Sequence, residues 1–286
     1  MSKIAILTET TADLTDRQKQ LPHLYQIPLY ILFGEESYKE NIEITHQEYY
    51  QRMEEIDYLP TTSQPTPSDF RMKYEEILGG GYDEIIVITM SSKLSGTSQS
   101  AALAAEDLQN VHVFNTRMAS FGEGLIVEQA CHLAENGASS GQIMTHLKVL
   151  DEETELLAML VTLDNVVKGG RLPKAAATIQ SFLGLKFIIR LRDGKVSLIK
   201  QTRTENKGFQ AMAKEFEKAL AESDQPLKAT IAHVNSSETG QELLDYMSER
   251  FLEVNFNLTS VGSVIGTHAG KGAAGLAWLP DYFSKK

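Results

Sequence analysis

Three segments of the sequence carry hydroxyl or imidazole groups in places that suit the binding of an anion. Ser95 stands just before a predicted helix, 97–108, and a helix N-terminus offers unpaired N–H groups and the positive end of a dipole. Thr62 and Ser63 fall in a proline-rich segment whose ring-locked backbone holds side chains in place. His268 is the one histidine of seven that lies in a glycine-rich segment after a predicted strand. Together these groups could hydrogen-bond one carboxylate or phosphate.

Each of these candidates also has an ordinary structural explanation. Ser95 is suited to cap the helix that follows it, because a serine oxygen accepts a hydrogen bond from a free N–H of the first turn. Thr62 and Ser63 could belong only to a stiff turn, and a single loop histidine is often an exposed polar residue. A capping hydroxyl can also bind an anion, so the sequence leaves both explanations open.

Two functions from different classes agree with these residues. The first is an anion-binding protein that performs no chemistry of its own. The second is a serine hydrolase or esterase with Ser95 as nucleophile and His268 as base. The second needs a further residue to orient the histidine, and the GxSxG elbow is absent around Ser95, which lies in the segment KLSGT. We therefore favour binding, and we assign no residue a catalytic role.

Two glycine patterns near the end of the sequence differ from nucleotide-binding loops. Residues 270–275 spell GxGxxG, but the dinucleotide fingerprint also needs a following helix, a second strand and an acidic residue about 20 positions further on. Residues 266–271 have the wrong glycine spacing for an NTPase loop, and Gly272 stands where that loop needs Ser or Thr. No histidine pair has the spacing of a zinc site. We expect neither a metal nor a cofactor.

Composition and charge exclude several broad classes. The 286 residues include 27 Lys+Arg and 38 Asp+Glu, and the net charge of −11 disfavours general binding of nucleic acid. The single cysteine, Cys131, can form no internal disulfide, which agrees with a reducing compartment. The apolar residues around it in the sequence predict that its side chain is buried. No apolar run approaches the ~18 residues of a membrane span, and the N-terminal run of four apolar residues is too short for a signal peptide. We expect a cytoplasmic protein without stable membrane insertion.

The elements that must position the candidate residues alternate between strands and helices in the first half of the chain. This alternation predicts a mostly parallel sheet with helices on its faces. The strands are expected at 3–8, 25–33, 84–90, 111–115 and 156–163, and helices at 45–56, 67–78 and 97–108. Ligands of such folds lie where strands end and helices begin, which is where the hydroxyl groups gather.

The second half predicts a mixed α/β arrangement. Asp193-Gly194 between two apolar runs, 187–191 and 196–200, is typical of a β-hairpin. Further helices are expected at 206–222 and 238–253, and strands at 228–234 and 258–265. The glycine-rich segment at 168–173 interrupts the pattern, so we predict an N-terminal α/β domain at 1–165 and a C-terminal α/β domain at 166–286.

Five segments, in this order, resemble one known family. They are TETTADL at 8–14, TSQP at 62–65, SSKLSGT at 91–97, KGGR at 168–171 and the glycine-rich loop at 266–275. These segments are similar to those of the DegV family, bacterial fatty-acid-binding proteins that serve as the lipid-carrying subunit of fatty acid kinase. The similarity runs through most of the chain and implies a fold of two α/β domains with an acyl chain buried at their interface.

The resemblance also implies a role for particular residues. Thr62 and Ser95 are expected to hydrogen-bond the carboxylate of a long-chain fatty acid such as palmitate (hexadecanoate), His268 to complete that polar cluster, and Arg171 to lie close by and assist when a kinase subunit delivers phosphate. Residues expected to support the site are Ser63, Gly96, Thr267 and Arg171. Because the chain lacks a nucleotide motif, the ATP-dependent chemistry is expected to belong to the separate kinase.

Overall fold

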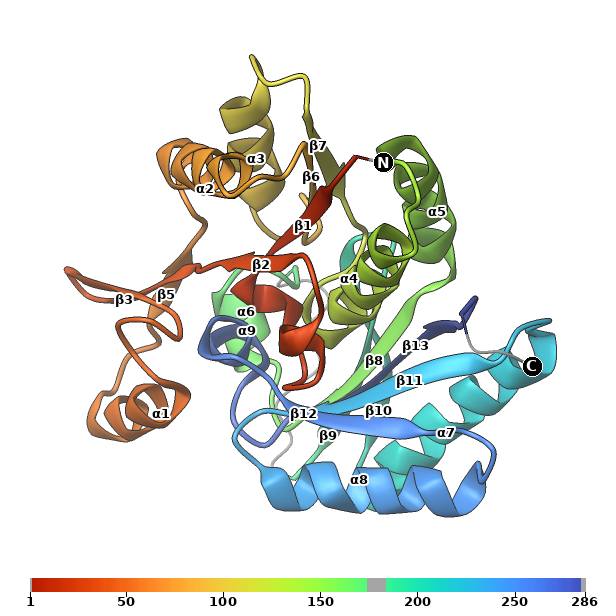
Figure 1. Ribbon diagram of the computed structural model, residues 1–286. Helices are drawn as coiled ribbons and strands as arrows, with labels where there is room; N and C mark the ends of the chain where they lie inside the picture. Colours follow the sequence, from red (N-terminus) through yellow and green to blue (C-terminus); the bar gives the residue numbers. More distant parts are fainter. Residues whose placement is uncertain (1, 174–183, 284–286) are drawn as a thin grey trace.

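The computed structural model describes residues 2–173 and 184–283, which form two main sheets and a small third sheet with helices around and between them (Figure 1). The strands are β1 (Ile4–Glu9), β2 (Leu24–Ile27), β3 (Tyr30–Phe33), β4 (Glu36–Lys39), β5 (Thr61–Ser63), β6 (Glu84–Thr89), β7 (Val111–Asn115), β8 (Glu155–Leu160), β9 (Lys186–Arg192), β10 (Lys195–Thr202), β11 (Leu227–His233), β12 (Phe256–Ser260) and β13 (Ala274–Pro280).

Helices are interspersed among these strands, and two short 3₁₀ helices lie at Thr10–Ala12 and Gln18–Gln20. The α-helices are α1 (His46–Glu55), α2 (Pro67–Gly79), α3 (Thr97–Ala105), α4 (Ser120–Glu135), α5 (Ser140–Glu153), α6 (Asp164–Lys168), α7 (Glu205–Glu222), α8 (Ser237–Arg250) and α9 (Ser263–Ala269). The capping boxes at Thr45/Glu48 and Thr66/Asp69 start α1 and α2, as such a pattern predicts.

The first sheet is parallel, with strand order β2-β1-β6-β7. The two central strands, β1 and β6, are apolar over most of their length because both faces of the sheet are covered. Ile4 and Ile6 pack toward the side of α4 and α5, whereas Ala5 and Leu7 pack toward α2 and α3. The predicted parallel α/β unit is confirmed for the strands expected at 3–8, 84–90 and 111–115 and for the first part of 25–33. The strand expected at 156–163 instead belongs to the second sheet, where it is β8 and pairs antiparallel with its neighbours.

The second sheet is mixed, with strand order β10-β9-β8-β13-β11-β12. Helices α7 and α8 pack on one face, and α4 packs on the other. Because α4 also contacts β1, it lies between the two main sheets (Figure 1), which explains why residues 120–131 of this helix are all buried. The division predicted at residue 165 stays a prediction; β8, which precedes it, pairs with β9 and β13 of the second sheet.

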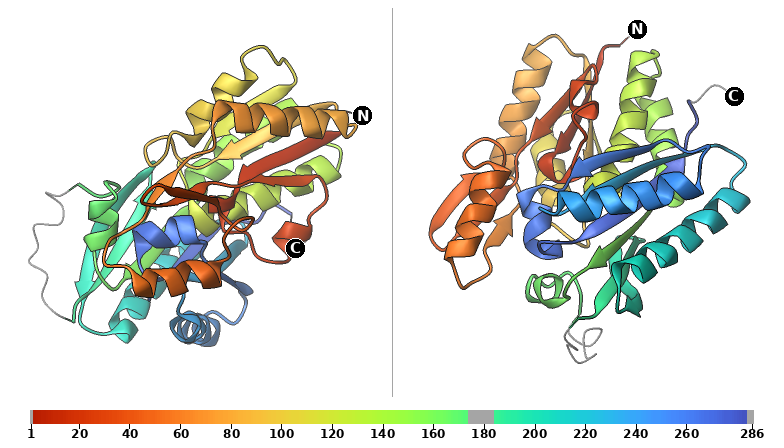
Figure 2. Two further views of the ribbon diagram at one scale, coloured as in Figure 1. Left: turned by 90° about the vertical axis from the view of Figure 1, so that its left-hand side faces the viewer. Right: turned by 90° about the horizontal axis from the view of Figure 1, so that it is seen from below.

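The small third sheet, β4-β3-β5, and α1 form an arm beside the rest of the chain (Figure 2). The arm packs on α9 through α1, β3 and β5. Ile31 and Tyr49 are buried between these elements together with Val264 of α9. This packing brings the proline-rich segment around β5 against the C-terminal part of the chain.

Two further predicted strands differ from the structure. The strand expected at 25–33 is two strands, β2 and β3, because Pro28 lacks the N–H that a continuous ladder needs. The strand expected at 258–265 was wrong beyond Ser260, where β12 ends. Gly262 is extended there and α9 begins at Ser263, so part of the segment expected to be a glycine-rich loop is helical. The hairpin at Asp193-Gly194 is confirmed, with left-handed φ values of 51° and 72° that suit the turn.

Candidate functional site

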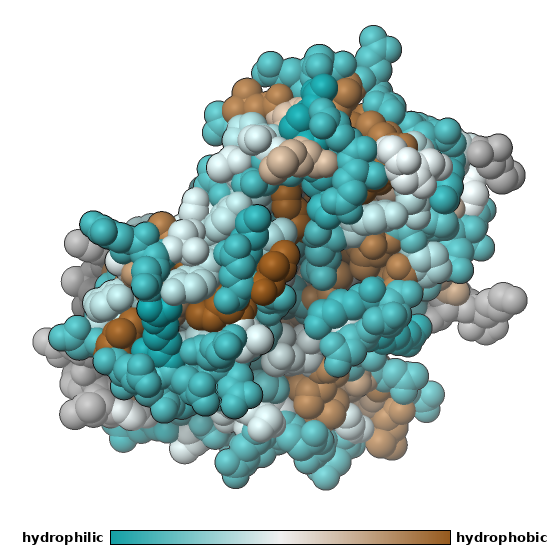
Figure 3. Space-filling view, turned by 60° about the vertical axis from the view of Figure 1, so that its left-hand side comes forward, coloured by the Kyte–Doolittle hydropathy of each residue, from teal (hydrophilic) through white to brown (hydrophobic). Residues whose placement is uncertain are grey.

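A cavity of about 140 Å³ lies between one face of the second sheet, the carboxyl end of the first sheet and α9. Its wall is mostly aliphatic and includes Leu160, Ala158, Ile189, Ala232 and Phe121. By contrast, the surface in Figure 3 is mostly hydrophilic, with apolar side chains exposed only in separate small groups. An apolar wall of this kind suits a hydrocarbon.

The polar residues of the wall come from four separate segments. Thr62 of β5, Ser95 before α3, Arg171 after α6 and His268 of α9 all line the cavity. Thr62 Oγ1 and His268 Nε2 are 2.9 Å apart and share a hydrogen bond. The fold therefore brings four of the residues chosen from the sequence to one cavity.

His268 is held neutral by its surroundings. Burial, and secondarily the nearby Arg171 cation, lowers the pKa of His268 to about 4. Its Nδ1 atom is buried without a hydrogen-bond partner among the described residues. An unpaired buried acceptor costs less than an unpaired buried N–H, so the favoured tautomer carries its proton on Nε2. In that tautomer Nε2 donates to Thr62 Oγ1, and the Thr62 hydroxyl proton is free to point into the cavity.

Gly169 packs directly against this imidazole. A Cβ atom added at Gly169 would collide with His268 Nδ1, so only glycine leaves room for the ring. Asn165 Nδ2 donates to the carbonyl of Thr267 at 3.0 Å and ties α6 to α9. The glycines at 169 and 170 stand out in the sequence, whereas no local pattern marks Asn165.

Arg171 is half-buried at the same cavity. Its Nε donates to the carbonyl of Leu94 at 3.0 Å, and its Nη1 donates to the carbonyl of Gly169 at 2.6 Å. Burial lowers the pKa of the Arg171 guanidinium below its usual value, although the group remains a cation at neutral pH. The guanidinium thus connects the Ser95 turn with the loop beneath His268.

Ser95 lies at the edge of α3 without being its N-cap. Gly96 occupies the N-cap position, and the Ser95 hydroxyl bonds Thr97 Oγ1 at 2.9 Å and accepts the Thr97 N–H at 3.3 Å. Ser95 therefore satisfies one N–H group of the first turn and lines the cavity as well. A Cβ added at Gly96 would lie 2.6 Å from Gln64 Nε2, so Gly96 allows the segments around Thr62 and Ser95 to touch.

The remaining candidates have different positions. Ser63 is exposed and lines the cavity, and its hydroxyl bonds the carbonyl of Gln64 at 3.3 Å. Thr267 is buried outside the wall, where its hydroxyl donates to the Ser263 carbonyl at 2.7 Å and bonds the Tyr49 hydroxyl at 2.8 Å. Thr267 thus fixes α9 against α1.

The arrangement opposes the hydrolase hypothesis. His268 Nε2 bonds Thr62, and the Ser95 hydroxyl bonds Thr97. Within residues 2–173 and 184–283, no carboxylate orients His268, because its Nδ1 atom has no partner. The serine–histidine–acid relay needed to activate a nucleophile is not formed.

A group of buried carboxyls, which no sequence pattern predicted, holds α9 in place. Asp13 accepts the Gly262 N–H at 2.6 Å, and Glu40 accepts the Val264 N–H at 2.8 Å. Burial raises the pKa of Asp13 to about 8 and that of Glu40 above its usual value. Asp13 also accepts a hydrogen bond from Ser120, which lines the cavity. The segment TETTADL, which contains Asp13, stood out only through the family resemblance, and Glu40 lies outside the segments singled out from the sequence.

The described part of the chain contains no cluster of His, Cys, Asp and Glu arranged to hold a metal ion. None of its helices is both long and apolar enough to cross a bilayer. Cys131 is buried in α4, as expected for a small apolar side chain, and burial raises the pKa of its thiol.

Comparisons with known proteins point to one family. A family model described as an uncharacterised protein of the DegV family matches residues 3–281. A DegV domain-containing protein of Halalkalibacterium halodurans is 33% identical over 280 residues, which are 97% of this chain and 99% of that protein.

Solved structures agree over the same length. A DegV family protein from Thermus thermophilus, described as binding fatty acid, is 31% identical with a TM-score of 0.90 over 98% of this chain and 100% of that one. A stearic acid-binding protein from Eubacterium ventriosum is 25% identical with a TM-score of 0.89 over 100% of both chains.

Proposed function

The chain belongs to the DegV family, and on that premise we propose that it binds one long-chain fatty acid and holds the carboxylate at the polar end of the cavity. The observation that carries the proposal is the meeting of an aliphatic wall with Thr62, Ser95, Arg171 and His268 in one cavity. The solved relatives described as binding fatty acid support the same ligand class.

The tail supplies most of the affinity in this proposal. Burial of a methylene group contributes ~0.8 kcal/mol, so a sixteen-carbon chain gains about 12 kcal/mol before the cost of ordering it. Hydrogen bonds to a charged carboxylate add ~1.5–3 kcal/mol each, much of which desolvation offsets. The polar residues therefore decide where the carboxylate lies more than how tightly the acid binds.

In this proposal the head group is held by hydroxyl donors at the polar end of the cavity. The Thr62 hydroxyl donates to one carboxylate oxygen while His268 Nε2 donates to Thr62, and the Ser95 hydroxyl donates to the other oxygen. The Arg171 guanidinium adds positive charge beside them. Ser63, Gly96 and Thr267 support these groups through position and packing.

The carboxylate is then presented to a separate ATP-dependent fatty acid kinase, which forms the acyl phosphate. The chain itself acts as a lipid-binding subunit without catalytic machinery, since its loops match no nucleotide-binding motif. Palmitate is a suitable first ligand to test. A cytoplasmic location, where the free thiol of Cys131 stays reduced, belongs to the same proposal.

Native mass spectrometry of the purified protein tests the proposal. We expect one acyl ligand per chain to be carried through purification, and removal of this ligand to leave a protein that takes up palmitate with one-to-one stoichiometry. Absence of any bound lipid, together with failure of the stripped protein to bind palmitate or stearate, would refute the proposal.

A further inference from the structure

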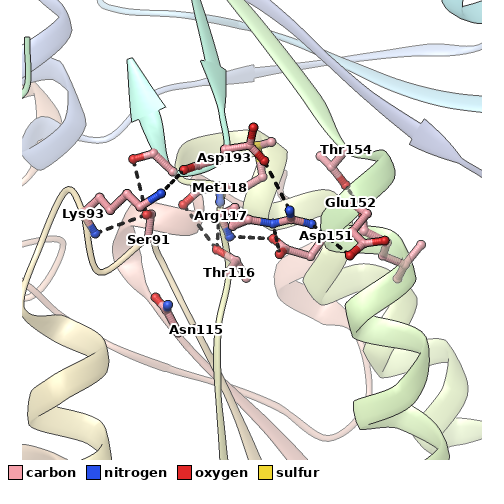
Figure 4. Close-up of polar contacts among 12 residues, drawn as sticks. Ser91, Lys93, Asn115, Thr116, Arg117, Met118, Asp151, Glu152, Thr154 and Asp193 are labelled. Carbon is pink, nitrogen blue, oxygen red and sulfur yellow. Dashed lines mark hydrogen bonds and ion pairs between the residues drawn. The ribbon is translucent and has the colours of Figure 1, made fainter. Parts of the chain in front are cut away.

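The turn at the tip of the β9–β10 hairpin docks on the loops that end two strands of the first sheet. Lys93 and Arg117 reach the turn from two sides (Figure 4). Lys93 Nζ donates to the carbonyl of Asp193 at 2.6 Å, and Arg117 Nη1 contacts the Asp193 carboxylate at 3.2 Å. The Gly194 N–H donates to the carbonyl of Arg117 at 3.0 Å. The second sheet is thereby tied to the first beside the cavity.

Gly194 makes the closest approach in this tie. It is buried, with a left-handed φ of 72°, and a Cβ atom added to it would collide with the Ser91 hydroxyl oxygen. Ser91 is itself only 2% exposed, and its hydroxyl donates to the Gly194 carbonyl at 3.4 Å. A side chain at position 194 would be strained at this φ and would force either the Ser91 hydroxyl or the hairpin turn to move.

Hydrogen bonds continue from Ser91 to Ser95. The N–H groups of Leu94 and Ser95 both donate to the Ser91 carbonyl, at 2.9 and 3.1 Å, and close a tight turn. The Lys93 N–H donates to the Ser91 hydroxyl at 3.3 Å. A displacement of Ser91 must therefore move the turn that carries the Ser95 hydroxyl.

Arg117 is fixed in its turn by α5. Its Nε donates to the Asp151 carboxylate at 2.7 Å, and the Arg117 N–H donates to the other oxygen of that carboxylate at 2.5 Å. Asp151 is buried, so this pair is poorly screened by water. The loop that receives the Gly194 N–H is thus a rigid support.

We propose that the Asp193–Gly194 turn positions Ser95 for the carboxylate of the bound acid, with Gly194 and Lys93 as positioning residues. This inference rests on the proposed function, since it concerns the same carboxylate. It predicts that a change on the second sheet, outside the cavity wall, alters the environment of the ligand's head group. A hairpin that only stabilised the fold would leave that environment unchanged.

The test uses the carboxyl ¹³C resonance of bound [1-¹³C]palmitate, which reports hydrogen bonding at the head group. The variants are Gly194→Ala, Ser95→Ala as the reference for a lost hydroxyl, and Gly81→Ala as the matched control. Gly81 has a left-handed φ of 87° and nothing within 4 Å of an added Cβ, so its substitution brings backbone strain without a collision. We expect Gly194→Ala to shift the resonance toward that of Ser95→Ala, and Gly81→Ala to leave it at the wild-type position.

Affinity and rescue complete the test. The dissociation constant of Gly194→Ala should stay within about tenfold of the wild-type value, because the tail supplies most of the binding. Adding Ser91→Ala to Gly194→Ala removes the oxygen that the new methyl group meets, so the resonance should move back toward the wild-type position. Should Gly194→Ala fail to fold, Lys93→Met removes the bond to Asp193 at an exposed position and should shift the resonance in the same direction by a smaller amount.

The outcomes separate the two proposals. If the wild-type protein gives no resonance of bound palmitate, the proposed function fails and this inference fails with it. If Ser95→Ala shifts the resonance but folded Gly194→Ala and Lys93→Met leave it unchanged, only the positioning role is overturned. A double variant that stays at the position of Gly194→Ala would contradict transmission through Ser91.

Discussion

Thr62 and His268, 206 positions apart in the chain, share a 2.9 Å hydrogen bond at the edge of the cavity. One residue lies on the arm strand β5 and the other on α9. Because the buried imidazole is neutral and its other nitrogen is unpaired, the histidine acts on the cavity through the threonine hydroxyl. At the polar end of the cavity, the Thr62 hydroxyl is therefore a donor whose direction is set by His268.

Replacing Thr62 with valine should leave most of the affinity for palmitate intact and slow the reaction of the bound carboxylate at the kinase. Valine keeps the branched shape that β5 accommodates but lacks the hydroxyl. Because the tail supplies most of the binding, palmitate affinity should fall by no more than about tenfold. Because the carboxylate is then misplaced, acyl-phosphate formation by the kinase should slow by about 100-fold. The neighbouring exposed residue on the same strand provides the control Thr61→Val, which should change neither quantity. Equal rates for Thr62→Val and the wild type would contradict the role of Thr62.

Gly169→Ala should destabilise the protein by displacing the imidazole. The added methyl group meets His268 Nδ1, and overpacking of this kind costs ~1–3 kcal/mol in the free energy of unfolding. Urea unfolding followed by circular dichroism measures the loss. The control is Gly79→Ala, where an added Cβ meets nothing within 4 Å. A loss no larger than that of the control would show that His268 can move freely.

The buried carboxyl of Asp13 should make stability fall as pH rises. Its pKa is about 8 in the folded protein against a reference of 3.8, so the folded state holds a proton that the unfolded state releases above pH 3.8. The stabilisation is complete at low pH and is lost progressively until the pH passes the folded pKa. Asp13→Asn mimics the protonated carboxyl without titrating.

The comparison between the wild type and Asp13→Asn isolates this group from the histidines, several of which have lowered pKa values that act in the opposite direction. Urea unfolding of both proteins at pH 5, 6.5 and 8 should show the wild type losing free energy of unfolding relative to the variant as pH rises. A constant difference, or one that grows in favour of the wild type, would mean that Asp13 is ionised in the folded protein.

Ser95 should resist serine-directed reagents. Its hydroxyl has no histidine base, so we expect no covalent adduct with a fluorophosphonate probe and no hydrolysis of a p-nitrophenyl ester above the rate of Ser95→Ala. Intact-protein mass spectrometry detects the adduct, with a reactive serine hydrolase in the same reaction as positive control. Labelling that disappears in Ser95→Ala would revive the hydrolase hypothesis.

Local patterns predicted the elements that depend on local chemistry. The apolar runs of the first sheet, the capping box at Thr45/Glu48 and the turn at Asp193-Gly194 each appear as the sequence indicates. In these places backbone preference and hydrophobic pattern agree. Thr62, Ser95 and His268, which were chosen from the sequence, line the same cavity, and their role in binding a carboxylate stays a prediction.

Long-range contacts decide the elements that the sequence did not predict. Helix α9 contains Gly266, a weak helix former, and its first turn is held by Asp13 and Glu40 from distant segments. Likewise, the pairing of Thr62 with His268 depends on the arm packing on α9. No local pattern records contacts of this range.

A crystal structure of the protein with 16-bromohexadecanoate tests the central claim most directly, because anomalous scattering locates the bromine at the end of the tail. The account predicts a bromine peak inside the cavity lined by Ala158 and Phe121, with the carboxylate within hydrogen-bonding distance of both Thr62 Oγ1 and Ser95 Oγ. A carboxylate remote from these two hydroxyls, or a bromine peak outside the cavity, would contradict it.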